Sequence, residues 1–459
     1  MDDLRDVDKT DDQRPTSVRY LVLGLVAFAS ASAYLTRYCI SVANTTIERD
    51  LMLTPAQMGQ VMAAFQLGYF VCQVPGGWLG SRIGTRAAFA LLSVGWSAAT
   101  IWTAGVVLYM PLLVSRTAFG MAQAGLVPIS AQVLRDWIPT SLRGTSSATI
   151  AASMSIGGAV TMGLTGVLLK YIDWRTVFFM YSIVGIVWAI VYYVLVRTYP
   201  RDHRWVNQAE LDLIHETVTP AHTDDERTLN SDSDRDSGVD EQVVPHATES
   251  APAAALKMLT SLSMWGVCIQ SFFRAAGYQV FASWFPSFLE KGYGVSTESA
   301  GLMTMAPMIG VVVGSLVGGG VIDWLLHRTG SKRVSRSLFA FVALTACGLL
   351  TYAASWTATA SQLVGVMAVA AALSGLGSPA AWAATIDISG RYTAVVMGVM
   401  NMAGTVGGML MTTSLGFLVT HIENTNGNWN HVVYVSAVVY LLAAVSWLIV
   451  HPDRGMTEN

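Results

Sequence analysis

Hydrophobic stretches of about 20 residues or more, each long enough to cross a bilayer as a helix, alternate with short polar segments along the chain. Six precede a long polar segment, at about 20–44, 56–80, 86–106, 108–134, 144–169 and 175–196. Six more follow it, at about 258–289, 298–325, 336–356, 360–385, 393–420 and 430–451. The pattern predicts an all-α membrane protein with twelve transmembrane helices in two sets of six, 20–196 and 258–451.

The polar segments predict the remaining domains. Residues 1–19 form a polar tail without a cleavable signal pattern, so we expect the first helix to be retained. In the central segment, 197–257, a short surface helix fits within 197–216. Residues 216–250 hold ten acidic and two basic residues, which favours a disordered tether over a regulatory segment. Residues 452–459 form the second tail.

The composition agrees with a membrane protein. Hydrophobic residues make up 53% of the chain and charged residues only 12%, against about 25% charged in soluble domains. The 41 glycines suit close packing of transmembrane helices. The four cysteines lie in apolar stretches without CxxC spacing, so packing explains them better than disulfides or metal ligation. We expect no metal and no cofactor.

The positive charges predict the orientation. If the N-terminus is cytoplasmic, 20 of the 27 lysines and arginines fall in cytoplasmic segments. Three more lie inside predicted helices, and four fall on the opposite side: Arg49, Lys170, Arg175 and Lys291. We therefore expect a multi-pass cell-membrane protein with both termini cytoplasmic; if the cell is Gram-negative, the membrane is the inner one. We expect a monomer in the lipid bilayer and no nucleic-acid partner.

Three arginines lie inside predicted helices: Arg37, Arg116 and Arg274. An arginine at mid-membrane costs about 2.5–3.5 kcal/mol on insertion scales and is a functional hypothesis by default. Pairing with a buried carboxylate or reaching toward the membrane surface would explain it without function. All 30 acidic residues lie in tails, loops or helix ends, which argues against ion pairs. Only Arg116 is near enough to a helix end to reach the surface, so we expect at least two arginines to line a cavity.

A glycine-rich pattern follows the second and the eighth predicted helices. The first copy is Gly76–Arg86 and the second is Gly319–Gly330, each leading into a short basic loop. In both halves the pattern resembles the signature loop of the major facilitator superfamily. The resemblance implies two six-helix bundles around a central cavity. Ser81 replaces the usual acidic residue of the first loop. The residues given gating or structural roles by this resemblance are Gly76, Gly77, Arg82, Gly84, Asp323 and Arg328.

Further motifs narrow the resemblance. They include Arg37–Asn44, Phe65–Trp78, Arg116–Pro128, His203–Trp205 and Gly407–Gly408. Together they resemble the anion:cation symporter family, which includes bacterial hexonate and galactonate transporters, sialin and vesicular glutamate transporters. The resemblance covers nearly the whole chain except the N-terminal tail and the acidic segment.

The resemblance assigns roles to the arginines. Arg37 and Arg116 fall on the family's two membrane arginines, and Arg274 falls on the arginine that vesicular glutamate transporters use for the substrate carboxylate. Proton-coupled bacterial members carry acidic residues where this chain has Thr36 and Gln123. Gln123 is two helical turns after Arg116, so it shares a face with that arginine but cannot hold a charge.

The arginines indicate a site for a small organic anion. A guanidinium binds a carboxylate through two parallel hydrogen bonds, and several arginines in one cavity repel each other unless an anion bridges them. Polar and aromatic residues at helical spacing extend the candidate site, although packing explains each of them equally well. These residues are Tyr34, Tyr69, Tyr278, Gln123, Trp382, Ser378 and Asn401.

The sequence thus favours a transporter of an organic anion, such as a sugar acid, working by alternating access. Because the usual titrating groups are absent, we expect a uniporter or exchanger. A proton- or sodium-coupled symporter of a dicarboxylate or aromatic acid and a non-transporting anion sensor remain alternatives. A cation exporter would need acidic cavity residues, an enzyme would need catalytic groups in the helices, and direct ATP drive would need a nucleotide motif. The sequence shows none of these.

Overall fold

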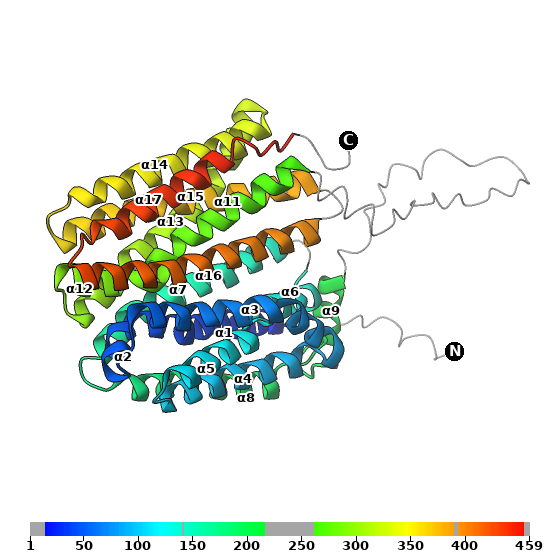
Figure 1. Cartoon of the computed structure of the whole chain (residues 1–459). Helices are drawn as coiled ribbons and strands as arrows, with labels where there is room; N and C mark the ends of the chain where they lie inside the picture. The colour runs from blue at the N-terminus through cyan, green and yellow to red at the C-terminus, as the bar shows by residue number, and fades with distance from the viewer. Residues whose placement is uncertain (1–13, 140–141, 216–260, 390–392, 454–459) are drawn as a thin grey trace, which may run out of the picture.

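The computed structural model describes residues 14–139, 142–215, 261–389 and 393–453. The predicted tether, 216–250, lies outside the described residues. In Figure 1 the described chain begins and ends at the same end of the molecule, on the side where N and C are marked, and we call this end the tail end. We call the opposite end the distal end.

The first half contains the six predicted membrane helices. They are α1 (Val18–Val42), α3 (Pro55–Ile83), α4 (Thr85–Gly105), α5 with α6 (Tyr109–Gln123 and Leu126–Trp137), α7 (Arg143–Leu168) and α8 (Trp174–Leu195). The fourth is divided because Pro128 has no N–H to donate to the carbonyl of Ala124. Short α2 (Asn44–Asp50) after the first span was not predicted, whereas α9 (Gln208–His215) fits the expected surface helix.

The second half contains the other six. They are α11–η5–α12 (Leu262–Gln279, Val280–Trp284, Phe285–Tyr293), α13 (Thr297–Thr329), η6–α14–η7 (Arg333–Leu338, Phe339–Ala353, Ala354–Trp356), α15 (Ala360–Ser389), α16 (Thr393–Thr425) and α17 (Asn430–Ser446). The π-helical turn η5 precedes Pro286, which cannot donate a backbone hydrogen bond within the helix. Helix α13 runs four residues beyond its predicted end, to Thr329, and ends at Gly330, whose φ of +65° favours glycine.

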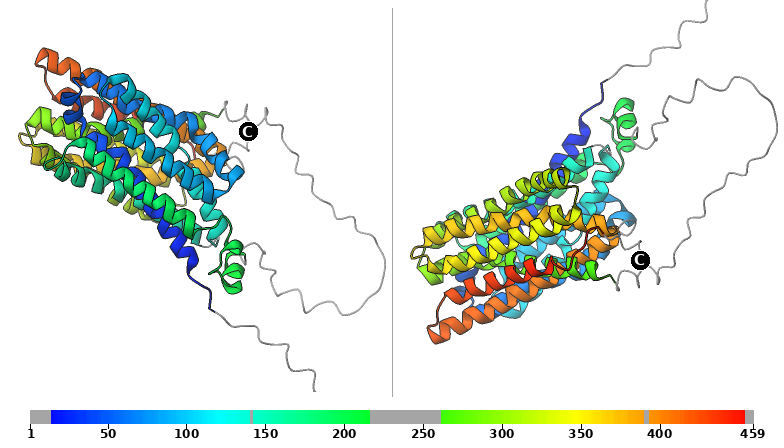
Figure 2. Two further views of the ribbon diagram at one scale, coloured as in Figure 1. Left: turned by 90° about the horizontal axis from the view of Figure 1, so that it is seen from below. Right: turned by 90° about the horizontal axis from the view of Figure 1, so that it is seen from above.

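The two halves repeat the same packing. Helix α3 packs on α5, α1 on α7 and α4 on α8; correspondingly, α13 packs on α15, α11 on α16 and α14 on α17. The halves meet where α3 packs on α16 and α7 on α13. Figure 1 shows the first-half helices below the second-half helices, and the views in Figure 2 show the same alignment of long helices. The predicted pair of related bundles is therefore present.

Glycines allow corresponding helices to touch at their backbones. A Cβ atom on Gly68 of α3 would lie 2.1 Å from the carbonyl oxygen of Thr117 in α5. In the second half, a Cβ on Gly314 of α13 would lie 1.9 Å from the carbonyl oxygen of Ala372 in α15. Larger residues at these positions would force the helices apart, so glycines fix the spacing inside each bundle.

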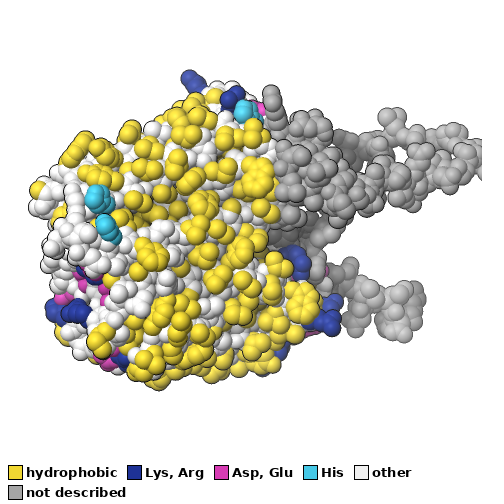
Figure 3. Space-filling model, viewed as in Figure 1, with side chains coloured by type: hydrophobic (Ala, Val, Ile, Leu, Met, Phe, Trp, Pro, Cys, Tyr) yellow, Lys and Arg dark blue, Asp and Glu magenta, His cyan; other side chains and the backbone are white. Residues whose placement is uncertain are grey.

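The outer surface suits a bilayer. Figure 3 shows hydrophobic side chains over the face between the two ends, with charged side chains gathered toward the ends. Nine of the described helices are long and apolar enough to span a membrane. Helix α3 is not among them because it carries inward-facing polar side chains such as Gln66, whose amide donates to Thr412 of α16 at 3.2 Å.

Candidate functional site

Arg37 of α1 has an amide for a partner. Its Nε donates to Oε1 of Gln123 in α5 at 2.7 Å, and Nε2 of Gln123 donates to the carbonyl of Ala33 at 2.9 Å. No carboxylate among the described residues forms an ion pair with Arg37, Arg116 or Arg274. The expectation that internal ion pairs do not explain these arginines therefore holds in the described part of the chain.

Three aromatic rings surround the Arg37 guanidinium. Its central carbon lies 4.5 Å from the ring centre of Tyr34, 4.7 Å from that of Phe65 and 5.1 Å from that of Tyr69. These distances favour cation–π attraction. Phe65 was not singled out from the sequence, although its place one turn before Tyr69 puts both rings on one face of α3. The rings and the Gln123 amide hold Arg37 in one orientation, while the residue remains partly exposed.

Arg116 of α5 lies behind Arg37. It is only 1% exposed, so it does not extend to the membrane surface. Its Nη2 donates to the carbonyl oxygen of Arg37 at 3.5 Å, and its guanidinium carbon lies 4.4 Å from the ring centre of Phe119. The Nε and Nη1 atoms are buried without a hydrogen-bond partner. In this conformation Arg116 therefore contacts the backbone of Arg37 and has almost no exposed surface.

Arg274 approaches from the other half. It lies on α11 and is partly exposed, and its Nε is buried without a hydrogen-bond partner. Tyr278, one helical turn further on, is close enough to interact electrostatically with both Arg37 and Arg274. The hydroxyl of Tyr38 in α1 donates to the hydroxyl of Tyr278 at 3.4 Å. The two partly exposed arginines thus lie on opposite halves, with this tyrosine pair joining the halves between them.

The remaining predicted binding residues are not joined to the arginines by any contact described here. Ser378 and Trp382 lie on α15, and Asn401 lies near the start of α16. Trp382 is 57% exposed and Asn401 is also exposed. The structure therefore brings Tyr34, Tyr69, Gln123 and Tyr278 to the arginines, while these three residues remain sequence-based candidates.

The predicted gating glycines pack or turn the chain at the tail end. A Cβ on Gly76 would lie 2.7 Å from the Cα of Gly125, and a Cβ on Gly77 would lie 3.0 Å from Pro128. Gly84 has a φ of +85°, which favours glycine, and it alone separates α3 from α4. The expected loop after the second helix is therefore a single residue, because the glycine-rich motif is itself helical.

The charged members of the two motifs are exposed. Arg82, Asp323 and Arg328 have no ion pair among the described residues. The tail-end ion pairs of the second half instead join Asp387 of α15 to Lys332 and to Arg336 of η6, each at 3.3 Å. Sequence reasoning did not assign these pairs because the motif ends before Lys332.

A polar cluster joins the two halves at the distal end. We call it the distal gate and define it as Asn44, Thr45 and Glu48 from the first half with Ser287, Glu290, Lys291 and Glu423 from the second. The Lys291 ammonium contacts the Glu48 carboxylate and lies 2.9 Å from that of Glu423. Thr45 donates to Glu290, and Nδ2 of Asn44 donates to Oγ of Ser287 at 2.7 Å.

Close backbone contacts support this gate. A Cβ on Gly59 of α3 would lie 3.1 Å from the Cα of Gly416 in α16, and a Cβ on Gly301 of α13 would lie 3.0 Å from the Cα of Gly166 in α7. Lys170 and Glu298, at the same end, form a further pair between the halves at 2.8 Å. The structure is therefore closed at its distal end.

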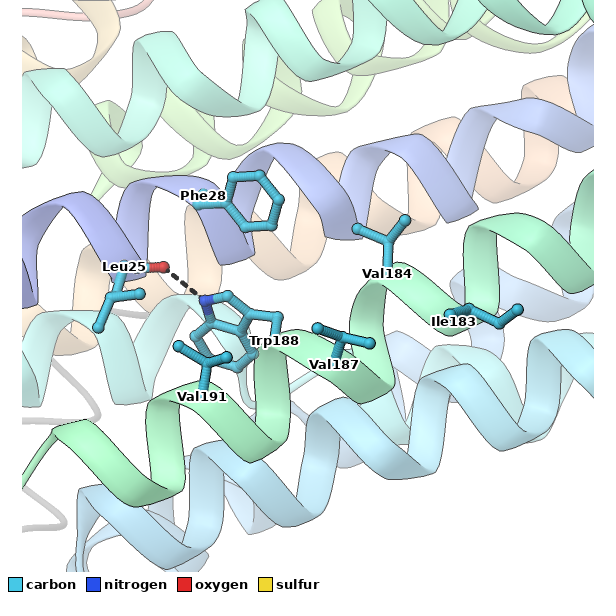
Figure 4. A pocket seen from close by; sticks show the side chains of 7 residues that line it. All are labelled: Leu25, Phe28, Ile183, Val184, Val187, Trp188 and Val191. Atoms are coloured by element: carbon cyan, nitrogen blue, oxygen red, sulfur yellow. Dashed lines mark hydrogen bonds between the residues drawn. The ribbon is translucent and has the colours of Figure 1, made fainter.

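A groove of about 460 Å³ on the outer surface between α1 and α8 is separate from the arginines (Figure 4). Figure 4 shows Nε1 of Trp188 donating to the carbonyl of Leu25, at 2.9 Å. The side chains that line the groove are all apolar or aromatic: Leu25, Phe28, Ile183, Val184, Val187, Trp188 and Val191. It has no group that would bind a small anion.

Comparisons with known proteins find similar proteins over nearly the whole chain. The family model described as Major Facilitator Superfamily matches residues 26–412 and 267–459. The chain is 26% identical to the "Probable sulfoacetate transporter SauU" of Cupriavidus necator, over 95% of this chain and 94% of that protein. It is 27% identical to the "D-galactonate transporter" of Escherichia coli, over 96% and 97% of the two chains.

A solved structure shows the same fold. It is a bacterial homolog of the human lysosomal transporter Spinster, in an inward-facing and occupied conformation. The TM-score is 0.72 at 16% identity, and the match covers 94% of this chain and 96% of the other.

Proposed function

This chain belongs to the Major Facilitator Superfamily, and from that premise we propose that it carries a small organic anion across the membrane by alternating access. The observation that carries the proposal is the cluster of Arg37, Arg116 and Arg274, which has no carboxylate partner among the described residues. Buried cationic groups are retained where they bind a charged ligand. The relatives described as transporters of sulfoacetate and galactonate support an anionic substrate.

Within this site we assign direct substrate contact to Arg37 and Arg274. Both are partly exposed, they come from opposite halves, and Tyr278 lies within electrostatic reach of each. A carboxylate or sulfonate can accept two hydrogen bonds from one guanidinium, and hydroxyls of Tyr34 and Tyr69 are placed to contact the rest of the substrate. Arg116 supports Arg37 from behind.

The proposed driving force for transport follows from the absence of a carboxylate beside the arginines among the described residues. Gln123 is the amide bonded to Arg37, and an amide does not titrate. We therefore propose that transport proceeds by uniport or exchange, with the substrate as counter-ion to the arginines. With both termini in the cytoplasm, as the charge distribution predicts, the distal end faces outward and this structure is closed to the outside.

The decisive experiment is counterflow with purified protein in proteoliposomes. Radiolabelled sulfoacetate, galactonate and glucarate are the probes, and a neutral hexose is the negative control. We expect exchange of at least one anion and none of the hexose, with exchange lost in Arg37→Ala. Arg201→Ala is the matched control, because Arg201 also lies over a ring, that of Tyr199 at 5.2 Å, but in the exposed segment after α8. Binding of an anion without exchange would instead indicate a sensor.

A further inference from the structure

We propose that the distal gate is a proton-binding site, in which Glu48 and Glu290 take up protons as the gate closes and release them as it opens. The bound proton would regulate alternating access, so this inference rests on the proposed function. The ligand is the proton itself, passed between water on the distal side and a carboxylate oxygen. Nothing in the resemblance or in the comparisons assigns a site to these residues.

The gate contains more negative than positive charge. Glu48 of α2 faces Lys291 and Glu290 of α12 and Glu423 of α16. Glu290 faces Arg49 of α2 as well as Lys291. Lys291 alone forms ion pairs with this cluster, to Glu48 and Glu423, while the hydrogen bond to Glu290 comes from a neutral threonine. Closing the gate therefore brings Glu48 and Arg49 of the first half to Glu290, Lys291 and Glu423 of the second, so that three carboxylates lie around one ammonium and one guanidinium.

Two carboxylate oxygens in the closed gate have nothing to bind. The side chain of Glu48 is only 7% exposed, and its Oε1 is buried without a hydrogen-bond partner. Oε1 of Glu290 is likewise buried and without a partner, as is Oδ1 of Asn44. Loss of hydration disfavours the ionised form of a carboxyl group, whereas a bound proton removes the charge and supplies an O–H donor. The geometry thus favours protonation in the closed state.

The pKa shifts of the two gate glutamates also favour protonation in the closed state. Burial raises the pKa of Glu48. The positive charge of Lys291 opposes this shift, and the negative charges of Glu423 and Glu290 add to it. Burial likewise raises the pKa of Glu290, and this shift is opposed by hydrogen bonds from Thr45 and Thr297 and by the charges of Arg49 and Lys291. Opening would separate the halves and rehydrate both carboxyl groups, so their pKa values would fall toward the ordinary range for glutamate. Because the closed state then binds more protons, lower pH stabilises it relative to the open state.

The position of the gate also indicates that its bound proton does not cross the membrane with the substrate. The gate is at the distal end, so water reaches it only from the distal side when the halves separate. A proton taken up there returns to that side and does not cross with the substrate. We therefore expect transport that depends on distal pH without net proton flux.

The test measures gate closure directly, by electron–electron distance spectroscopy between spin labels at Met52→Cys and Asn424→Cys in nanodiscs. Met52 is 90% exposed beside α2, Asn424 is exposed at the end of α16, and Cys72, the partly exposed native cysteine, is replaced by serine. Between pH 8 and pH 5 we expect the ratio of closed to open populations to rise severalfold, with a limit of about tenfold per pH unit for each proton bound.

Matched variants identify the responsible groups. Glu48→Gln with Glu290→Gln should keep the gate closed at every pH, because glutamine imitates the protonated acid. Asp50→Asn is the control, since Asp50 pairs with Arg175 inside the first half and should leave the pH response unchanged. Unchanged populations in the wild type, or a full pH response in the double variant, would overturn the proposal. The measurement needs no substrate, so its outcome is independent of whether the chain carries organic anions.

Discussion

Two charge clusters in this molecule are unbalanced in opposite directions. In the middle of the helices, Arg37, Arg116 and Arg274 have no carboxylate partner among the described residues. At the distal end, three carboxylates lie around two cations, Lys291 and Arg49. Neither arrangement is what stability alone would favour, because uncompensated buried charge is costly. Both proposals supply the missing charge from outside the chain, as a substrate anion for the arginines and as a proton for the gate.

The difference lies in what completes each cluster. The arginines need an anion large enough to reach both halves, so the middle cluster selects a substrate. The gate needs only a proton, which its buried and unpartnered oxygens can hold. The halves meet near the first cluster through Tyr38 and Tyr278, and at the second through the ion pair between Lys291 and Glu48. Substrate binding and proton binding would thus both affect the movement between the two halves, at different depths in the membrane.

Removing the central arginine should have the largest effect. Arg37→Ala deletes the guanidinium that Gln123 and three rings orient, and losing a buried charge-assisted pair costs about 2–5 kcal/mol, or about 30-fold to several thousandfold in anion exchange. Arg37→Lys keeps the charge but loses the planar fork, so it should recover only part of the activity. Wild-type counterflow by Arg37→Ala would remove this residue from the site.

Breaking the gate should come next. Lys291→Met leaves Glu48 and Glu423 without their shared cation, so the halves should separate at the distal end. Removing one partner of a buried ion pair costs about 3–5 kcal/mol, enough to change the closed state from major to minor. Distances between labels at positions 52 and 424 would report the change, with Lys291→Arg as the charge-conserving control. If the methionine variant stays closed, the lysine is not what holds the gate.

The helix pattern predicts much of this architecture from sequence, because long apolar runs have few alternatives in a bilayer. Helix ends were harder to place. The π-helical turn before Pro286 and the division at Pro128 depend on local hydrogen bonding, and the glycine motif after the second helix is helical up to Ile83. The hydrophobic pattern does not distinguish a glycine-rich loop from glycine-rich helix contacts.

The candidate site was predictable only in part. Arginines in apolar runs are conspicuous, and helical spacing correctly brought Tyr34 to Arg37. The same spacing placed Gln123 on the face of Arg116, whereas in the structure its amide oxygen accepts a hydrogen bond from Arg37 of another helix. Phe65 and Tyr38 resemble any other core aromatic residue in the sequence. The distal gate was not predicted, because its charges come from segments far apart in the chain, such as α2, α12 and the end of α16. Which acid meets which base there depends on how the two halves pack.

Adding a carboxylate to the arginine cluster should make substrate affinity depend on pH, as gate closure does in the proposed proton site. Gln123→Glu places an acid 2.7 Å from Nε of Arg37, where it would compete with the substrate anion whenever it is ionised. We expect apparent substrate affinity to fall about tenfold at pH 8, the equivalent of about 1.4 kcal/mol, and to recover as the pH is lowered. Substrate titrations at several pH values would check this. A pH-independent affinity would show that the introduced acid does not titrate in the site.

Arg116→Met should have a smaller effect on transport. Two of the three nitrogens of Arg116 are buried without partners, so methionine removes an uncompensated charge and preserves most of the volume. We expect a melting temperature at or above that of the wild type and a loss of exchange smaller than that of Arg37→Ala. Thermal unfolding and counterflow on the same preparations would check both. A loss as large as that of Arg37→Ala would mean that Arg116 contacts the substrate in another conformation.

The smallest effect is expected for the ion pair that does not cross between the halves. Hydrogen bonds from Arg175 and Trp174 lower the pKa of Asp50, so its stabilisation is present above the ordinary pKa of aspartate and is lost as the pH falls through the lowered value. The Asp50 side chain is 43% exposed, which limits the pair to below about 1 kcal/mol. Asp50→Asn should therefore lower the melting temperature by about 1–2 °C at pH 7. This difference should shrink below about pH 4, where the ordinary aspartate carboxyl group becomes protonated. A larger loss at neutral pH, or one that also altered gate closure, would show that this pair takes part in the movement between the halves. A small loss of stability with unchanged gate closure would show that the Asp50–Arg175 pair, which lies within one half, takes no part in the opening of the distal end.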